Sequence, residues 1–345
     1  MKRYRILLMV HETLVPPEDI EGLSDKEIDV FRSEYDVYST LYNLGHDVRV
    51  LGILDRLSGL RETVNSWKPH IVFNMLQEFS GITAYEQYVV AYLEMMRQRY
   101  TGCNPRGLML SRDKIMTKQV LAWHRISTPA FQLFPFGARF REPKKGKLEF
   151  PLFVKSATED ASLGIAQASI VEDMDQLRER VGFIHENVQS DALVEEYIDG
   201  RELYIGVLGN KRLTTLPVWE IDFGTLAEKR NGIATRRVKW DRAYQARHGI
   251  RTGPAEGLSQ AEADKLARLA KRIYRALHMC GFARMDLRMR EDGRVFLLEA
   301  NANPDLTHGE DLAESARSVG INYDKLISRI VSLGLSYMPE WRLYE

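Results

Sequence analysis

The first hundred residues alternate between stretches with the apolar pattern of buried strands and stretches with the pattern of helices. Residues 4–10, 47–51 and 71–75 are expected to be strands, and residues 24–44 and 84–98 are expected to be helices. Strands and helices in this order form a parallel sheet covered by helices on both faces. The chain is therefore expected to be an α/β protein that begins with such a sheet.

The turn after the first strand argues against a dinucleotide-binding version of this sheet. That version needs the pattern Gly-x-Gly-x-x-Gly at this turn, whereas residues 11–19 read HETLVPPED. The helix that follows has a start signal of its own, because Ser24 and Glu27 have the spacing of a capping box. Gly45 is a suitable C-cap for its end.

Composition narrows the function classes. Among the 345 residues there are 48 Lys or Arg and 48 Asp or Glu, so no general basic field points to nucleic acid. Cys103 and Cys280 form no CxxC pair, which rules out a zinc knuckle and favours a reducing compartment over a disulfide scaffold. The apolar run at residues 6–10 is too short for a signal peptide, and no window approaches the roughly 20 apolar residues of a membrane span. We expect a soluble, cytoplasmic protein.

The rest of the chain has a different texture. Residues 101–107 are rich in turn formers and mark the first expected domain boundary, and Ser111 is expected to cap a helix that carries Lys114 and Lys118. Further strands are expected at 152–155, 167–171, 192–195, 202–208, 212–217, 282–289 and 295–299, and further helices at 173–186, 259–279, 310–318 and 323–333. Residues 222–257 show no clear periodicity, and loops of this length are usually functional or disordered.

Two expected strands near the C-terminus have a chemical pattern of their own. In residues 282–289, charged and apolar side chains alternate, so the charged ones share one face of the strand: Arg284, Asp286 and Arg288. The dipeptide Asp292-Gly293 is a hairpin signal. The strand at 295–299 is therefore expected to return alongside the first.

This hairpin brings oxygen-bearing side chains together. Asp286 is expected to lie near Glu299, with Asn301 two residues further along the same face. Carboxylate and amide oxygens are the ligands that Mg²⁺ prefers, and without a metal the two acids would repel each other. The alternative is a surface hairpin whose acids are neutralised by Arg284 and Arg288. The pattern alone leaves both interpretations open.

Two lysines and a second hairpin complete the candidates. Lys155 ends an apolar strand before a loop of small residues, an arrangement that can cradle a phosphate although it is not a Walker loop. Lys114 lies at a helix start. For both lysines, a solvated or snorkelling side chain is the common alternative. Residues 193–203 combine acids, an Asp-Gly turn and a returning strand, which suits either a nucleotide pocket or an ordinary hairpin.

Taken in order, these motifs resemble the ATP-grasp superfamily and, within it, the D-alanine–D-alanine ligase group. The likeness is carried by YTGCNPRGLMLSRDKIMTK, FPLFVKSATEDASLG, LVEEYIDGRELYIGVL, FARMDLRM and LLEANANPDLTHGEDLAESARSVGINYDKLI, within residues 100–335. The first hundred residues are similar only in layout. The resemblance implies an ATP-grasp fold with an N-terminal parallel α/β domain (1–105), a central subdomain (106–200) and a C-terminal subdomain with the metal and catalytic site (201–345).

The resemblance also implies roles for individual residues. The residues implied to hold ATP are Lys114, Lys155, Ser162, Glu195, Tyr197, Ile198, Glu202 and Leu298. Of these, Lys114 and Lys155 would contact phosphates and Glu202 the ribose. The adenine pocket would be lined by Glu195, Tyr197 and Ile198. Two Mg²⁺ or Mn²⁺ ions would be bound by Asp286, Glu299 and Asn301. Lys239 would close a loop over the phosphates, and Arg284 would stabilise an oxyanion.

This sequence departs from the family where amino acids would bind. At the place of a Gly-rich HGxxGEDG segment it reads FNMLQEFSGITAYEQ, and the residue aligned to a first-strand Glu is Glu12, in uncertain register. The remaining departures are Ala161 for a Ser, Trp240 for a Tyr, Asp305 for a Gly, and the region 308–310 for a Ser. The residues that bind ATP in the family are kept in this sequence, whereas most of those that bind the amino acids differ. We therefore expect a different pair of substrates.

The family reaction implied is the joining of a carboxylate to an amine through an acyl phosphate, with release of ADP. Its narrower version is a D-alanine–D-alanine ligase of peptidoglycan synthesis. The alternatives are an ATP-binding regulatory module without turnover and a phosphotransferase that stops at the acyl phosphate. Likeness to the family implies a homodimer acting on small-molecule acids and amines. The basic residues Arg236, Arg237 and Arg242 suit either an anionic substrate or a solvated loop.

Overall fold

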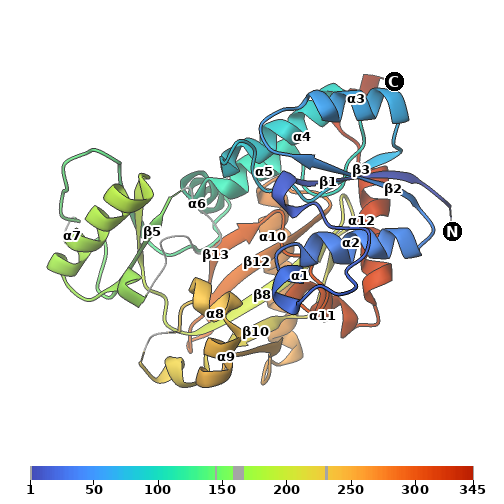
Figure 1. Cartoon of the computed structure of the whole chain (residues 1–345). Coiled ribbons are helices and arrows are strands. Elements are labelled where there is room, and N and C mark those ends of the chain that lie inside the picture. The colour runs from blue at the N-terminus through green and yellow to red at the C-terminus, as the bar shows by residue number, and fades with distance from the viewer. Residues whose placement is uncertain (1, 144–145, 158–166, 230–231, 345) are drawn as a thin grey trace.

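The N-terminal strands form a parallel sheet, as the alternation predicted. In the computed structural model, which describes residues 2–143, 146–157, 167–229 and 232–344, β1 (Arg5–His11) lies between β2 (Asp47–Ile53) and β3 (Ile71–Asn74) (Figure 1). The α/β class expected for the start of the chain is confirmed.

Helices cover this sheet on both faces, but one of them comes from the other end of the chain. Side chains of β1 alternate between two clusters, since neighbouring residues of a strand point to opposite faces. One cluster contains α3 (Ser58–Trp67) and α4 (Glu86–Met95), and the other contains α2 (Arg32–Asn43) and α12 (Tyr323–Ser336). Figure 1 shows α2 and α12 side by side. The C-terminal helix thus completes the N-terminal layer.

Two expected helix starts are corrected by the structure. The capping box of Ser24 and Glu27 is present, but it opens only a short helix, α1 (Asp25–Ile28), and α2 begins separately at Arg32. Ser111 caps nothing, since it lies inside α5 (Pro105–Arg112). The next helix, α6 (Lys114–Trp123), is capped by Asp113, whose carboxylate accepts hydrogen bonds from two backbone amides of its first turn.

The middle of the chain forms a four-stranded antiparallel sheet. Its order is β4-β7-β5-β6, with the bounds β4 (Phe131–Phe134), β5 (Leu152–Ser156), β6 (Ile170–Val171) and β7 (Ala192–Glu196). Helix α7 (Met174–Phe183), extended by one π-type turn (Ile184–Val188), packs on it, and the lobe stands at the left of Figure 1. The predicted strand at 167–171 is shorter than expected, because Gln167–Ser169 is a 3-10 turn.

The C-terminal region contains the largest sheet. Its order is β11-β10-β8-β12-β13 with β9 beside β8, and the bounds are β8 (Arg201–Leu208), β9 (Thr214–Thr215), β10 (Trp219–Asp222), β11 (Arg251–Pro254), β12 (Phe282–Met289) and β13 (Val295–Asn301). Helix α10 (Gln260–Ala276), with the expected capping box of Ser259 and Glu262, covers one face. Further elements are α11 (Asp311–Arg317) and the 3-10 turns Glu12–Leu14, Thr83–Tyr85, Gly224–Lys229 and Glu340–Tyr344.

Residues 222–257 were expected to form one long loop, and this expectation was wrong. The segment forms α8 (Arg236–Trp240), α9 (Arg242–His248) and β11. These elements are too short to show a period, and they are held by packing, because Val238 is buried against Trp219 and Phe223. The predicted strand at 212–217 shrinks to the two residues of β9.

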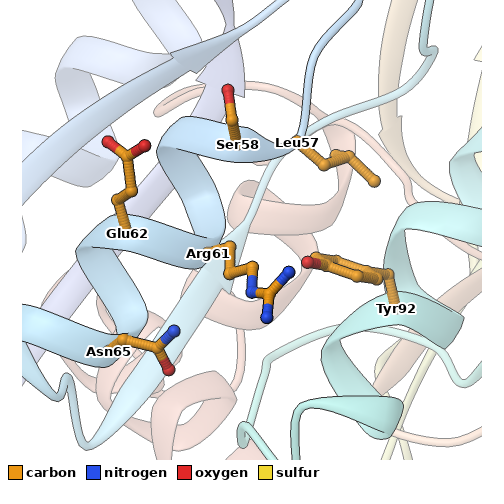
Figure 2. A pocket seen from close by; sticks show the side chains of 6 residues that line it. All are labelled: Leu57, Ser58, Arg61, Glu62, Asn65 and Tyr92. Carbon is orange, nitrogen blue, oxygen red and sulfur yellow. The ribbon is translucent and has the colours of Figure 1, made fainter.

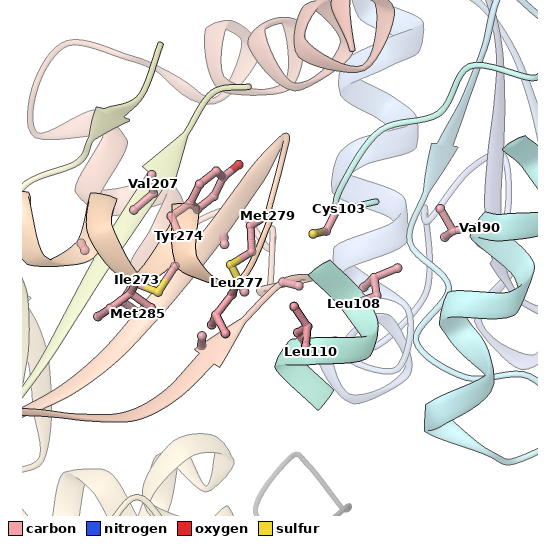
Figure 3. Close-up of a cluster of buried hydrophobic side chains, with 14 of the residues drawn as sticks. Val90, Cys103, Leu108, Leu110, Val207, Ile273, Tyr274, Leu277, Met279 and Met285 are labelled. Carbon is pink, nitrogen blue, oxygen red and sulfur yellow. The ribbon is translucent and has the colours of Figure 1, made fainter. Parts of the chain in front are cut away.

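One hydrophobic core joins the N-terminal sheet to the C-terminal one. Figure 3 shows Cys103, Leu108 and Leu110 between Val90 of α4 and Ile273 of α10. The segment at the predicted boundary near residue 105 is thus packed on both sides, and the three-domain division stays a prediction. Both cysteines are free and buried. In the described part of the chain, no helix is long and apolar enough to cross a membrane.

Candidate active site

Strand β12 gives the C-terminal sheet two different faces. Its apolar side chains pack with α10 in the core: Ala283, Met285, Leu287 and Met289. Its charged side chains lie on the opposite face, as the alternation predicted: Arg284, Asp286 and Arg288. Their direct neighbours on β8 are Gly206, Tyr204 and Glu202. We call this second side, with Glu202, Tyr204, Arg284, Asp286 and Arg288, the polar face of the sheet.

The register of β12 and β13 brings the expected side chains together. Asp286 is paired with Glu299, and Arg284 with Asn301, so this geometric prediction is confirmed. A bulge follows the pair, since the next pairing after Asp286–Glu299 is Leu287–Leu297 and Leu298 has no partner in the register. A bulge re-aims the side chains beside it.

The charged groups of this site pair with one another across neighbouring elements. The guanidinium of Arg284 donates two hydrogen bonds to Asp286, Nε to Oδ1 at 2.7 Å and Nη2 to Oδ2 at 2.9 Å. The ammonium of Lys114 lies 3.8 Å from Oε1 of Glu299. Arg284 thus neutralises Asp286, as the surface-hairpin interpretation expected, but Arg288 pairs with neither acid. Asp286 is only 4% exposed, so the hairpin is not a surface feature.

The donor set at the strand end suits a divalent cation. It consists of the carboxylates of Asp286 and Glu299 and the amide of Asn301, whose Oδ1 accepts a hydrogen bond from the Asn303 amide at 2.9 Å. Hard oxygen ligands with few carboxylates are typical of Mg²⁺ sites that share the ion with phosphates. Within the described ranges, no group of three His, Cys, Asp or Glu side chains could hold a metal by itself.

Two buried lysines share one carboxylate beside this site. Nζ of Lys118 lies 2.6 Å from Oε1 of Glu195, and Nζ of Lys155 lies 2.9 Å from Oε2. Burial alone would raise the pKa of Glu195, but the two ammonium groups outweigh it and lower the pKa to about 2. Burial lowers the pKa of Lys118. We call these three buried groups, Lys118, Glu195 and Lys155, the Lys–Glu–Lys cluster.

The alternative of solvated lysines is wrong for both predicted positions. Lys114 and Lys155 are each only 8% exposed. Lys118 was not assigned a role from the sequence, yet it is the nearer partner of Glu195. The available signal was its spacing, because residues four apart on a helix share a face and Lys114 was already a candidate. Its partner lies on a distant strand and gives no local signal.

The nucleotide residues expected after β7 meet at one arginine. Arg288 donates Nε at 3.2 Å and Nη2 at 2.7 Å to Oε2 of Glu202, and Nη1 at 3.1 Å to the carbonyl of Ile198. Tyr204 donates its hydroxyl to Oε1 of Glu202 at 2.9 Å. The Arg288 guanidinium also lies 5.8 Å from the Tyr197 ring centre. The sequence placed Arg288 on the correct face but assigned it no role in a site.

The loop lysine lies on the same side of the molecule as Arg284. Lys239 is half-buried on α8, whose first turn is capped by Thr235. Burial raises the pKa of Asp311, while Arg284 and Lys239 both act to lower it, so both cations lie near that carboxylate. Arg237 and Arg242 are exposed, as the solvated-loop alternative expected. Ser162 and Ala161 lie outside the described residues.

The region where the sequence departs from the family is acidic in the structure. Asp305 Oδ1 accepts hydrogen bonds from the backbone amide and hydroxyl of Thr307, at 2.8 and 2.6 Å, and Asp36 accepts one from the His308 amide at 2.9 Å. Burial, with Asp305 and Asp311 nearby, raises the pKa of Glu310 to about 7. Several acidic side chains therefore gather in this region.

A hollow of about 510 Å³ lies elsewhere, on the N-terminal lobe. Figure 2 shows its lining, five residues along α3 and its N-cap and one residue on α4: Leu57, Ser58, Arg61, Glu62, Asn65 and Tyr92. Every predicted site residue lies outside this hollow. The chemical groups therefore gather on the polar face of the C-terminal sheet and at the Lys–Glu–Lys cluster, not there.

Comparisons with known proteins identify the family of the chain. Residues 125–332 match the family described as "D-ala D-ala ligase C-terminus". The chain is 30% identical over 305 residues to the "Uncharacterized protein y4sG" of Sinorhizobium fredii, covering 86% of this chain and 85% of that protein. It is 34% identical over 241 residues to a D-alanine–D-alanine ligase of Bordetella petrii, covering 70% and 69%. The fold is similar to that of a D-alanine–D-alanine ligase from Bacillus anthracis complexed with ATP, with a TM-score of 0.72, 21% identity and coverage of 96% and 97%.

Proposed function

The chain belongs to the D-alanine–D-alanine ligase family of ATP-grasp enzymes and is an ATP-dependent, ADP-forming ligase, and we propose that it joins a carboxylate to an amine other than a pair of D-alanines. The proposal rests on one observation. Asp286, Glu299 and Lys114, which would serve ATP chemistry, lie together, while Glu310 lies in the region where the family has a Ser for the substrate's second carboxylate.

The proposed reaction has two steps. A carboxylate oxygen of the first substrate attacks the γ-phosphorus of ATP, forming an acyl phosphate and releasing ADP. The amine nitrogen of the second substrate then attacks the acyl carbon, the C–O bond to phosphate breaks, and the amine loses a proton. Negative charge develops on the acyl oxygen in the second step, and Arg284 is proposed to stabilise it. Closure of the segment with Lys239 is proposed to keep water from the acyl phosphate.

Each group of contacts has a proposed part in binding ATP. Lys114 and Lys155 would hold phosphate oxygens, Tyr197 and Ile198 would line the adenine pocket, and Glu202 would bind the ribose. Since both oxygens of Glu195 are in contact with lysines, we propose that its carboxylate positions Lys155 rather than reading adenine. The roles of Ser162 and Leu298 in binding ATP remain proposals from family resemblance.

Magnesium is proposed as the cation of the site, with Asp286, Glu299 and Asn301 as its ligands. All three ligand side chains already have partners: Arg284 bonds to both oxygens of Asp286, the Lys114 ammonium lies 3.8 Å from Glu299, and the Asn303 amide bonds to Asn301. A carboxylate or amide oxygen has two lone pairs, so one hydrogen bond does not prevent it from binding a cation. A bound Mg²⁺ would neutralise the charge of the transferring phosphoryl group. A homodimer is proposed from family likeness alone. The residues named for the site all come from one chain, so the proposed site does not require a second subunit.

The function is tested by a screen of acids and amines. We expect purified protein with ATP and Mg²⁺ to release phosphate above background with at least one pair of substrates. D-alanine alone should give little ADP and no dipeptide. Hydroxylamine should trap the acyl phosphate as a hydroxamate. Turnover of D-alanine to its dipeptide would contradict the proposed change of substrate, and a complete lack of phosphate release would favour an ATP-binding module without turnover.

A conservative change of Arg284 separates chemistry from binding. Arg284→Lys is expected to lower kcat about 100-fold and to leave the KM for ATP nearly unchanged, because the guanidinium that lysine lacks is proposed to stabilise charge that develops only in the transition state. The matched control is Arg294→Lys on the same hairpin, where the arginine pairs with Asp292 and is largely exposed. Equal losses in the two variants would contradict the role given to Arg284.

A further inference from the structure

Arg288 is buried in a way that its strand position does not require. It faces the polar side of β12 and is only 4% exposed. An apolar residue of similar size at such a position would usually serve stability as well as an ion pair, since burying a charge costs about as much as the pairing returns. The burial of an arginine with several partners is better explained by a role in orienting those partners.

The partners of Arg288 come from separate segments that meet only in the folded chain. Nε and Nη2 bond to Glu202 on β8, Nη1 bonds to the Ile198 carbonyl after β7, and Nη2 also bonds to the Gly232 carbonyl ahead of α8. Its guanidinium lies 5.5 Å from the ring centre of Phe223, which follows β10. One side chain thus connects the strand, the turn after β7 and the segment that leads to Lys239.

Glu202 is left in a defined orientation by these contacts. Arg288 occupies Oε2 with two hydrogen bonds, and the Tyr204 hydroxyl occupies one lone pair of Oε1. A carboxylate oxygen has two lone pairs, so Oε1 keeps one acceptor site directed away from the arginine. A carboxylate held in this way can accept a hydrogen bond from one particular hydroxyl of a ligand.

We propose that Arg288 is a positioning residue of the nucleotide site, which orients Glu202 toward the ribose hydroxyls and ties the Ile198 and Gly232 backbones to it. This inference rests on the proposed function in one respect, the assignment of Glu202 to the ribose. Lysine cannot replace this arginine, because a single ammonium on a flexible stem cannot bond to three partners that are arranged for a planar fork. In this proposal Arg288 acts through Glu202 and the two backbone segments, and not on the phosphates or the reacting atoms.

The test compares ATP with 2′-deoxy-ATP by calorimetric binding to the full chain, in the presence of Mg²⁺. Wild type is expected to prefer ATP. Arg288→Lys is expected to weaken ATP binding about tenfold and to bring the ratio of the affinities for ATP and 2′-deoxy-ATP close to one. Its kcat should change less than its KM for ATP. The Glu202→Gln variant should lose the same preference, and the double variant should lose little more than either alone, because both changes act through one carboxylate.

The matched control is Arg201→Lys, an arginine on β8 that also forms a bidentate pair, with Glu220, at 2.7 and 2.5 Å. It should keep the wild-type preference for ATP over 2′-deoxy-ATP.

If Arg288→Lys fails to fold, Glu202→Gln still tests the claim, since it leaves the guanidinium in place. An unchanged preference in the Arg288 and Glu202 variants, or losses that multiply in the double variant, would overturn the inference. Nucleotide binding without ligase turnover would count against the proposed reaction but not against Arg288.

Discussion

Glu299→Gln is expected to lower the rate of phosphate release about a thousandfold. The change keeps the shape of the side chain and removes one of two carboxylates that face each other across β12 and β13. Charge stabilisation of a transferring phosphoryl group by a metal is worth several kcal/mol, and each 1.4 kcal/mol is a factor of ten in rate. The measurement is phosphate release under saturating ATP, repeated over a range of Mg²⁺ concentrations.

A readout independent of turnover is also available. Binding of Mn²⁺, followed by the loss of its free electron-spin resonance signal, should weaken in the variant. The matched control is Glu291→Gln, an exposed acid at the turn of the same hairpin, which should keep both the rate and the metal binding. If Glu299→Gln retained a tenth of the wild-type rate with an unaltered Mg²⁺ requirement, the metal assignment would be wrong.

Glu195→Gln is expected to reduce the free energy of unfolding by about 3–5 kcal/mol, because it leaves two buried ammonium groups without a counter-charge. The amide keeps the volume of the carboxylate, so little of the loss comes from packing. Unfolding in urea, followed by circular dichroism at pH 7, measures the difference. The control is Glu196→Gln, the next residue of β7, which pairs with Arg290 where solvent reaches both groups, and a loss below about 1 kcal/mol is expected there.

The pH dependence of this difference follows from the pKa of Glu195. Its pKa is lowered to about 2 in the folded protein, against 4.5 for an ordinary glutamate. A carboxyl with a lowered pKa stabilises the fold above its unfolded pKa, and that contribution is lost as the pH falls toward the folded value. The gap between wild type and Glu195→Gln should therefore stay constant above about pH 5 and narrow between pH 4.5 and pH 3. A gap that does not depend on pH would show that the charge is not the cause.

Local sequence patterns predicted the parts of the site that depend on neighbouring residues. The alternation in β12 and the Asp292-Gly293 turn were sufficient to pair Asp286 with Glu299, because strand periodicity and hairpin geometry are local properties. They were less successful with short elements. Segment 222–257 was expected to be a long loop, functional or disordered, and its helices form because distant side chains such as Trp219 pack against them.

Local patterns in the chain were enough to predict the α/β start, the hairpin and its polar face, and the kinship with ATP-grasp ligases. Three features became visible only in the folded chain: Lys118 and Lys155 share Glu195, Arg288 holds Glu202, and α12 covers the N-terminal sheet. The two groups differ in the range of the interactions that produce them. Backbone periodicity and turn chemistry depend on residues that are close in the sequence. The partner of a buried charge can come from a distant segment, and the residues around the charge do not indicate which segment that is.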